Sequence, residues 1–84
     1  MTAESPRLVV LSRDYCHLCG EMVEALQALQ RSIPFSIEVL DVDDDPRLEA
    51  RYGERVPVLL AGDEELCHYR LDPVAVNAWL AKFR

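Results

Sequence analysis

The hydrophobic periodicity of the chain changes twice within its first half, and these changes restrict the fold. Residues 7–12 form a continuous apolar run with adjacent valines, which is typical of a strand buried on both faces. From residue 16 to about residue 33 the apolar residues recur at helical spacing, and Pro34 ends this pattern. Residues 35–42 then alternate as a second strand does. Two strands joined through a helix are expected to lie parallel, with a right-handed crossover.

Two further helices are indicated by capping residues. Asp45 as N-cap, Pro46 at the first helical position and Gly53 as the C-terminal stop delimit a short helix. Asp72 as N-cap and Pro73 at the first position begin a closing helix. The apolar face of this closing helix is expected to comprise Val76, Trp79, Leu80 and Phe83.

A β-hairpin completes the expected elements. Residues 58–61 and 65–69 predict its two strands, and the Gly-Asp pair at residues 62–63 predicts its turn. The resulting order is β-α-β-α-β-β-α, which a single α/β domain over residues 1–84 accommodates as a four-stranded mixed sheet with helices on both faces. We expect this domain to be a monomer.

Charge and cysteine content restrict the function. Fifteen acidic residues against nine basic ones give a net charge of −6, which argues against nucleic-acid binding. Residues 1–12 carry no basic segment and only a short apolar run, so we expect no signal peptide, no membrane span and a cytoplasmic location. Because cytosolic thiols are kept reduced, the three cysteines point to catalysis or metal binding rather than to a stable structural disulfide.

Two of these cysteines, Cys16 and Cys19, lie where the expected helix begins. Free N–H groups and the positive end of the helix dipole would stabilise a thiolate at Cys16. Cys19, one turn further along the same side, would lie within disulfide reach of Cys16. This placement suits a redox-active dithiol.

Other interpretations of the pair are weaker. A structural zinc site needs a second ligand pair, and the remaining candidates are His17, Cys67 and His68. Cys67 and His68 are neighbours on an expected strand and would point to opposite faces. An incidental pair is disfavoured, because a Cys-x-x-Cys between a buried strand and a helix is the context of a redox motif. A metal or iron–sulfur site shared between two chains through Cys16 stays open.

Three segments carry a resemblance to a known family. They read YCHLC at residues 15–19, RVPVLL at residues 55–60 and DVDDDPRLEARYG at residues 41–53. In these segments the chain resembles the thioredoxin superfamily, and specifically a small glutaredoxin-like group of bacterial proteins. The resemblance covers nearly the whole chain in the same element order, and it implies the thioredoxin-like fold and thiol–disulfide oxidoreductase activity.

The resemblance also implies roles for individual residues. Cys16 matches the nucleophile of the family and Cys19 the resolving thiol. Pro57 matches a cis-proline beside the dithiol, which leaves the backbone of Val56 free to pair with an extended substrate. Arg13 matches a basic position that glutaredoxins use toward the carboxylate of glutathione.

Some residues differ from the glutaredoxin pattern at the expected substrate site. His17 and Leu18 replace the Pro and Tyr that usually stand between the cysteines. His68 and Tyr69 stand where a glycine pair lets glutathione approach the backbone. Asp72 is available as a further substrate contact. We therefore expect no bound cofactor and weak glutathione binding.

The remaining candidates have both functional and structural interpretations. Tyr15 either lines the substrate groove or packs beside the turn. His17 would favour the thiolate if protonated, but not as an exposed neutral imidazole. Cys67 is expected to be a small buried strand residue. The acidic residues before the second helix lack the glycine and distal glutamate of a calcium loop, and we expect a helix cap and a solvated loop from Asp41, Asp43, Asp44 and Asp45.

Together these patterns predict a dithiol–disulfide oxidoreductase. Its substrate would be a disulfide-containing protein or a small thiol substrate, and an unidentified reductant would restore the dithiol of the enzyme. The alternative is a thioredoxin-fold binding module without turnover, which a disulfide-reduction assay would distinguish. We expect neither nucleic acid nor a membrane as a partner.

Overall fold

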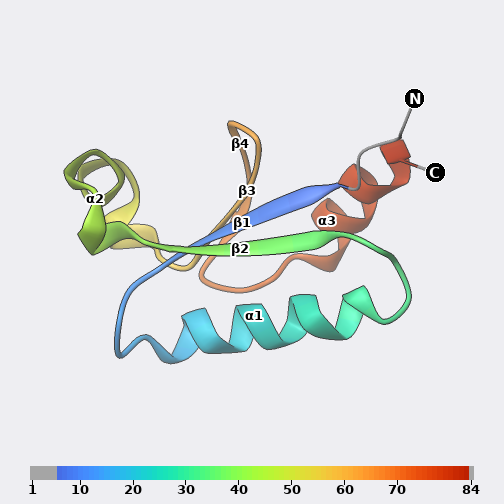
Figure 1. Cartoon of the computed structure of the whole chain (residues 1–84), viewed down its shortest axis with the longest axis horizontal. Helices are drawn as coiled ribbons and strands as arrows, with labels where there is room; N and C mark the ends of the chain where they lie inside the picture. The colour runs from blue at the N-terminus through green and yellow to red at the C-terminus, as the bar shows by residue number, and fades with distance from the viewer. Residues whose placement is uncertain (1–5, 84) are drawn as a thin grey trace.

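The computed structural model describes residues 6–83, which form a four-stranded mixed sheet flanked by helices (Figure 1). The strands lie in the order β2-β1-β3-β4. β1 pairs parallel with β2 and antiparallel with β3, and β3 pairs antiparallel with β4. The strands are β1 (Arg7–Ser12), β2 (Ser36–Asp41), β3 (Val58–Ala61) and β4 (Glu64–His68), and the α-helices are α1 (His17–Gln30), α2 (Pro46–Tyr52) and α3 (Pro73–Leu80). The expected element order and thioredoxin-like α/β fold are confirmed.

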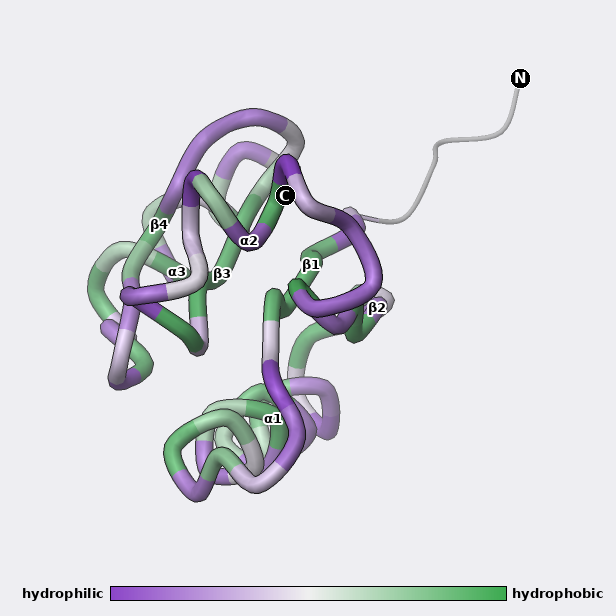
Figure 2. The backbone as a smooth tube through the Cα atoms, turned by 90° about the vertical axis from the view of Figure 1, so that its left-hand side faces the viewer, coloured by the Kyte–Doolittle hydropathy of each residue, from purple (hydrophilic) through white to green (hydrophobic). Residues whose placement is uncertain are grey.

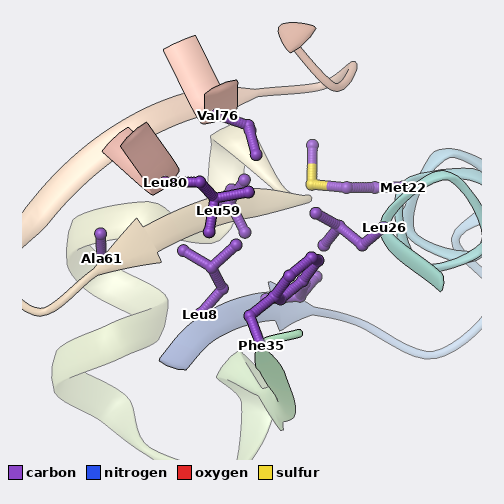
Figure 3. Packing of buried hydrophobic residues seen from close by; sticks show 9 residues of the cluster. Leu8, Met22, Leu26, Phe35, Leu59, Ala61, Val76 and Leu80 are labelled. Carbon is purple, nitrogen blue, oxygen red and sulfur yellow. The ribbon is translucent and has the colours of Figure 1, made fainter. Parts of the chain in front are cut away.

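Alternate residues of the central strands pack on opposite faces of the sheet, as the period of a strand requires. Leu8 of β1 belongs to a buried cluster with residues of α1 and α3 (Figure 3), and Val10 is a further member of this cluster. Leu11 of β1 belongs to a second cluster, with Tyr52 of α2. In Figure 2, where the tube is coloured by residue hydropathy, β1 and β3 are largely hydrophobic. Helices therefore cover both faces of the sheet.

Several element ends differ from the expected ones. α1 ends at Gln30, and the N–H groups of Ser32 and Ile33 both bond to the Leu29 carbonyl. Pro34 has no N–H to donate to the Gln30 carbonyl, and its ring would clash with that carbonyl in a continuing helix, so the helix ends there. β2 covers only residues 36–41, and the 3₁₀ turn η1 (Val42–Asp44) follows it.

The hairpin and the closing helix show smaller differences. β4 spans Glu64–His68, with a register irregularity between Leu59 and Leu60 of its partner strand. Trp79 packs against the cluster under α3 but stays partly exposed. The side chain of Phe83, expected on the same face, lies outside the described residues.

Gly53 ends α2 in a different way from the one expected. Its φ of −54° is ordinary helical backbone, not the left-handed conformation of a glycine stop. The chain continues from it into a second 3₁₀ turn, η2 (Gly53–Arg55). Gly62 in the hairpin turn does have a positive φ, of 61°, as the turn requires.

Within residues 6–83, no helix is both long and apolar enough to cross a lipid bilayer.

The cluster under α1 makes a stability prediction. Leu26 is fully buried in it, so Leu26→Ala should lower the free energy of unfolding by about 2–5 kcal/mol. Gln27 is exposed on the same helix, and Gln27→Ala should change it by less than about 0.5 kcal/mol. Urea unfolding followed by circular dichroism measures both. Equal effects of the two substitutions would contradict this packing.

Candidate functional site

Cys16 occupies the N-cap position of α1. Its backbone is extended, with φ −103° and ψ 107°, and its Sγ accepts a hydrogen bond from the Cys19 N–H at 3.2 Å. No acidic residue lies in the first turn of the helix, so no carboxylate opposes a negative charge on this sulfur there. The backbone donor and the positive end of a fourteen-residue helix both favour a thiolate at Cys16.

Cys19 lies one turn further along α1 and forms a disulfide with Cys16. The two Cα atoms are 5.2 Å apart, which is an ordinary separation for a disulfide. Cys19 is 5% exposed, whereas Cys16 is partly exposed. An external molecule therefore reaches Cys16 more readily than Cys19, as nucleophile and resolving thiol would require.

Tyr15 projects into solvent directly before the nucleophile position. Its backbone is left-handed, with φ 63°, and its side chain is fully exposed. Packing beside the turn, one of the two interpretations of this residue, is therefore wrong. Tyr15, Cys16 and the exposed His17 line an open depression of about 370 Å³. A left-handed conformation costs a residue with a Cβ about 1–2 kcal/mol, so the turn holds Tyr15 outward at some cost in stability.

Val56 and Pro57 precede β3, which pairs with β1. Because Val58 lies opposite Leu11 in the register, Pro57 lies at the end of the sheet from which the Cys16 loop leaves. The Val56–Pro57 bond is cis, as the resemblance implied. Within the described residues, no hydrogen bond is made by the half-buried Val56 backbone, so its N–H and C=O are open to an extended segment.

Tyr69 closes the other side of the Pro57 loop. Its N–H donates to the Pro57 carbonyl at 2.8 Å, and its hydroxyl donates to the Glu54 carbonyl at 3.1 Å. Its φ of 66° is a conformation that favours glycine, yet a tyrosine occupies it. Tyr69 and Leu18 line a groove of about 280 Å³ beside α1.

Arg13 leaves the end of β1 and is held by groups of the protein itself. Its guanidinium bonds to the carboxylates of Asp43 and Glu49 and to the carbonyl of Gly53. The hydrogen bond to Glu49, followed by the bond to Asp43, raises the pKa of Arg13 above its ordinary value, so the side chain stays charged.

The carboxylate of Asp72 is also engaged. It accepts hydrogen bonds from the N–H groups of Val74 and Ala75, at 3.0 and 3.3 Å. This confirms Asp72 as the N-cap of α3. A role in substrate binding stays a prediction, and the same carboxylate would have to serve both purposes.

The acidic run before α2 was only partly understood from the sequence. Asp45 caps α2, as expected, whereas Asp41 caps the 3₁₀ turn η1, which was not expected. Asp43 instead pairs with Arg13, which was not expected, and Glu49 was not singled out at all. The available signal was topological, because the segments after β1 and β2 leave the parallel pair at the same end.

Within residues 6–83, no three or more His, Cys, Asp and Glu side chains of one chain gather in an arrangement that could hold a metal ion. His68 is paired with Glu65 at 2.9 Å, while Cys67 packs against the cluster under α1 and α3. These neighbours therefore face different surroundings, as their strand position predicted.

Cys67 is a partly buried free thiol on β4. Burial raises the pKa of this thiol above its ordinary value, and this effect exceeds the lowering by the backbone hydrogen bond of Asp72. Because only the thiolate is nucleophilic, the raised pKa makes Cys67 less reactive than an ordinary cysteine near neutral pH. The structural interpretation of Cys67 thus agrees with its surroundings.

A labelling experiment tests this interpretation. In a Cys16→Ser, Cys19→Ser double variant, iodoacetamide should modify Cys67 several-fold more slowly than free cysteine at about pH 8.5, where an ordinary thiol is half ionised. The difference should narrow as pH rises, because a raised pKa delays ionisation. The same variant unfolded in urea is the control. Equal rates in folded and unfolded protein would contradict burial of the thiol.

Comparison with known proteins adds a family match. The model of a family described as Glutaredoxin-like domain (DUF836) matches residues 7–81. An uncharacterized protein of Mycobacterium tuberculosis is 29% identical over 82 residues, which cover 92% of this chain and 84% of that one.

Solved structures are similar over nearly the whole chain. A Nitrosomonas europaea protein solved by NMR has a TM-score of 0.84 and 43% identity, covering 94% of this chain and 95% of that one. A protein from X. campestris solved by X-ray crystallography has a TM-score of 0.66 and 41% identity, covering 89% of this chain and 96% of that one. Thioredoxin 1 of Thermosipho africanus shares the fold, with a TM-score of 0.60. It is 20% identical, and the match covers 92% of this chain and 97% of that one.

Proposed function

Because the chain belongs to the glutaredoxin-like (DUF836) family, we propose that it is a thiol–disulfide oxidoreductase whose dithiol is Cys16 and Cys19. The observation that carries the proposal is the position of Cys16. Its sulfur accepts a backbone N–H at the start of α1, is partly exposed, and is bonded to a buried Cys19. These are the properties of an attacking thiolate with a resolving partner.

The reaction would proceed by two thiol–disulfide exchanges. The Cys16 thiolate attacks one sulfur of a substrate disulfide, which forms a mixed disulfide and releases one substrate thiolate. Cys19, deprotonated, then attacks the Cys16 sulfur and releases the second substrate thiolate. Both released thiolates take up protons. Two electrons pass from the protein dithiol to the substrate, and an external dithiol reductant restores Cys16 and Cys19.

We propose a protein disulfide as the substrate. The open backbone of Val56 can pair with an extended segment of another chain, as in strand addition. The exposed Tyr15 offers an aromatic surface next to Cys16 on which an apolar side chain of that segment could pack. The cytoplasmic location expected from the sequence stays a prediction.

Insulin, whose disulfides are accessible, provides a defined test. The reduced protein should reduce insulin, and Cys16→Ser should abolish this activity because no other cysteine is placed to attack. Cys19→Ser should instead accumulate a mixed disulfide at Cys16, identified by peptide mass spectrometry, because the resolving thiol is missing.

Cys67→Ser is the matched control, since it removes a cysteine that the mechanism does not use, and it should retain activity. If the unaltered protein reduced no disulfide and formed no mixed disulfide as Cys19→Ser, the chain would be a binding module with this fold and not an oxidoreductase.

Glutathione is expected to be a poor ligand of the site. The groups that would hold a small anionic peptide are already bonded: Arg13 to two carboxylates, and Asp72 to the start of α3. Tyr69 places a large side chain where close approach to the backbone needs a glycine. Each hydrogen bond that a ligand cannot form costs it about 0.5–1.5 kcal/mol.

Substitution of Tyr69 tests this expectation. Tyr69→Gly should raise turnover of hydroxyethyl disulfide with glutathione, because it opens the groove and suits the left-handed backbone. Tyr69→Phe removes only the hydroxyl that bonds Glu54 and should not raise turnover. An ordinary glutaredoxin should be run beside them. Comparable turnover by the unaltered protein would show that glutathione is a good substrate after all.

A further inference from the structure

The guanidinium of Arg13, three residues before Cys16, forms hydrogen bonds through each of its nitrogen atoms. Nε lies 3.2 Å from both carboxylate oxygens of Asp43, Nη2 lies 2.6 Å from Glu49 Oε2, and Nη1 lies 3.3 Å from the Gly53 carbonyl. All three guanidinium nitrogens therefore have partners. The partners come from η1, α2 and η2, which are consecutive segments on one side of the sheet.

The identity of residue 53 provides an independent observation. Its backbone is ordinary helical, so no turn requires a glycine here. A Cβ at this position would overlap the carboxylate of Glu49 and approach Arg13 Nη2 to 3.0 Å. An alanine at residue 53 would therefore require the Glu49 carboxylate, the far end of a flexible side chain, to move from the position in which it pairs with Arg13.

The contacts of Arg13 join the two segments that flank the dithiol. Arg13 lies three residues before Cys16, and Gly53 lies four residues before Pro57. We propose, resting on the function proposed above, that Arg13 is a positioning residue: it holds the Cys16 loop against the segment that carries Pro57, rather than binding the carboxylate of a thiol substrate.

Charge balance argues against the ligand-binding role. A substrate carboxylate would have to displace Asp43 or Glu49, both of which belong to the protein and are already in place. It would also approach two negative charges around a single cation, which is unfavourable. Because its guanidinium is already paired with Asp43 and Glu49, Arg13 offers no free cationic group to a small anionic thiol, and its contacts serve to hold the Cys16 loop.

Two substitutions disturb this arrangement by different routes. Arg13→Gln removes the cation, whereas Gly53→Ala removes no charge and acts only through the added Cβ. Each has a matched control. Arg7→Gln removes an arginine paired with Glu38 at the other end of β1, and Gly20→Ala adds a Cβ that meets nothing within 4 Å.

The primary measurement is the fraction of Cys16 present as thiolate at neutral pH. It is read from ultraviolet thiolate absorbance in a Cys19→Ser, Cys67→Ser background, where Cys16 is the remaining cysteine. Arg13→Gln should lower this fraction by about two- to fivefold, because the loop that carries Cys16 loses contacts of the strength of partly exposed ion pairs. Gly53→Ala only shifts the Glu49 carboxylate, so it should lower the fraction less, by about 1.5- to twofold. Both controls should leave it unchanged. Because no turnover is needed, this readout is independent of whether the protein reduces disulfides.

The second measurement is the KM for glutathione in the otherwise unaltered protein, which Arg13→Gln should change by less than about twofold. Arg13→Lys keeps the charge without the planar fork and should restore the thiolate fraction only partly, which keeps the test valid if Arg13→Gln folds poorly. A KM raised tenfold with an unchanged thiolate fraction would overturn the proposal and assign Arg13 to ligand binding. An unchanged thiolate fraction in Gly53→Ala, or full rescue by Arg13→Lys, would also overturn it.

Discussion

The pairing of β1 with a strand on each side determines where every part of the site lies. β2 runs parallel to β1, so the segments that leave both strands meet at one end of the sheet. β3 runs antiparallel to β1, so it begins at that same end, and Pro57 with it. Strand pairing therefore brings the Cys16 loop, Arg13 and the Pro57 segment to one end of the sheet, where the contacts of Arg13 join the Cys16 loop to the segment before Pro57.

In this arrangement the Cys16 sulfur is accessible to solvent, whereas two charged side chains of the site are hydrogen-bonded to other groups of the protein. Cys16 has a backbone donor and a helix terminus that favour its thiolate, and it faces solvent between Tyr15 and His17. In contrast, Arg13 and Asp72 are bonded within the chain. The proposal of a protein substrate rests on this arrangement, because a protein segment would bring its own backbone and apolar contacts whereas a small charged thiol would need the occupied groups.

Local patterns predicted the fold and the dithiol well, because periodicity and caps act over a few residues. The helical repeat before Pro34 and the Asp45-Pro46 start of α2 are of this type. The Arg13 contacts escaped prediction because their partners are 30 to 40 residues away in sequence, and only the assembled sheet brings them together. The sequence predicted that the Tyr69 side chain hinders the approach of glutathione. It did not predict the left-handed backbone of Tyr69, because glycine is the residue that normally indicates this conformation.

The central claim is that Cys16 and Cys19 form a redox-active pair and not a structural disulfide. The most direct measurement is the reduction potential of this pair, from equilibration in dithiothreitol buffers with the two states separated by alkylation and mass spectrometry. The account predicts a value between about −270 and −120 mV, the range of thioredoxin-fold oxidoreductases. A value below about −300 mV, typical of structural disulfides that resist cellular thiols, would contradict it.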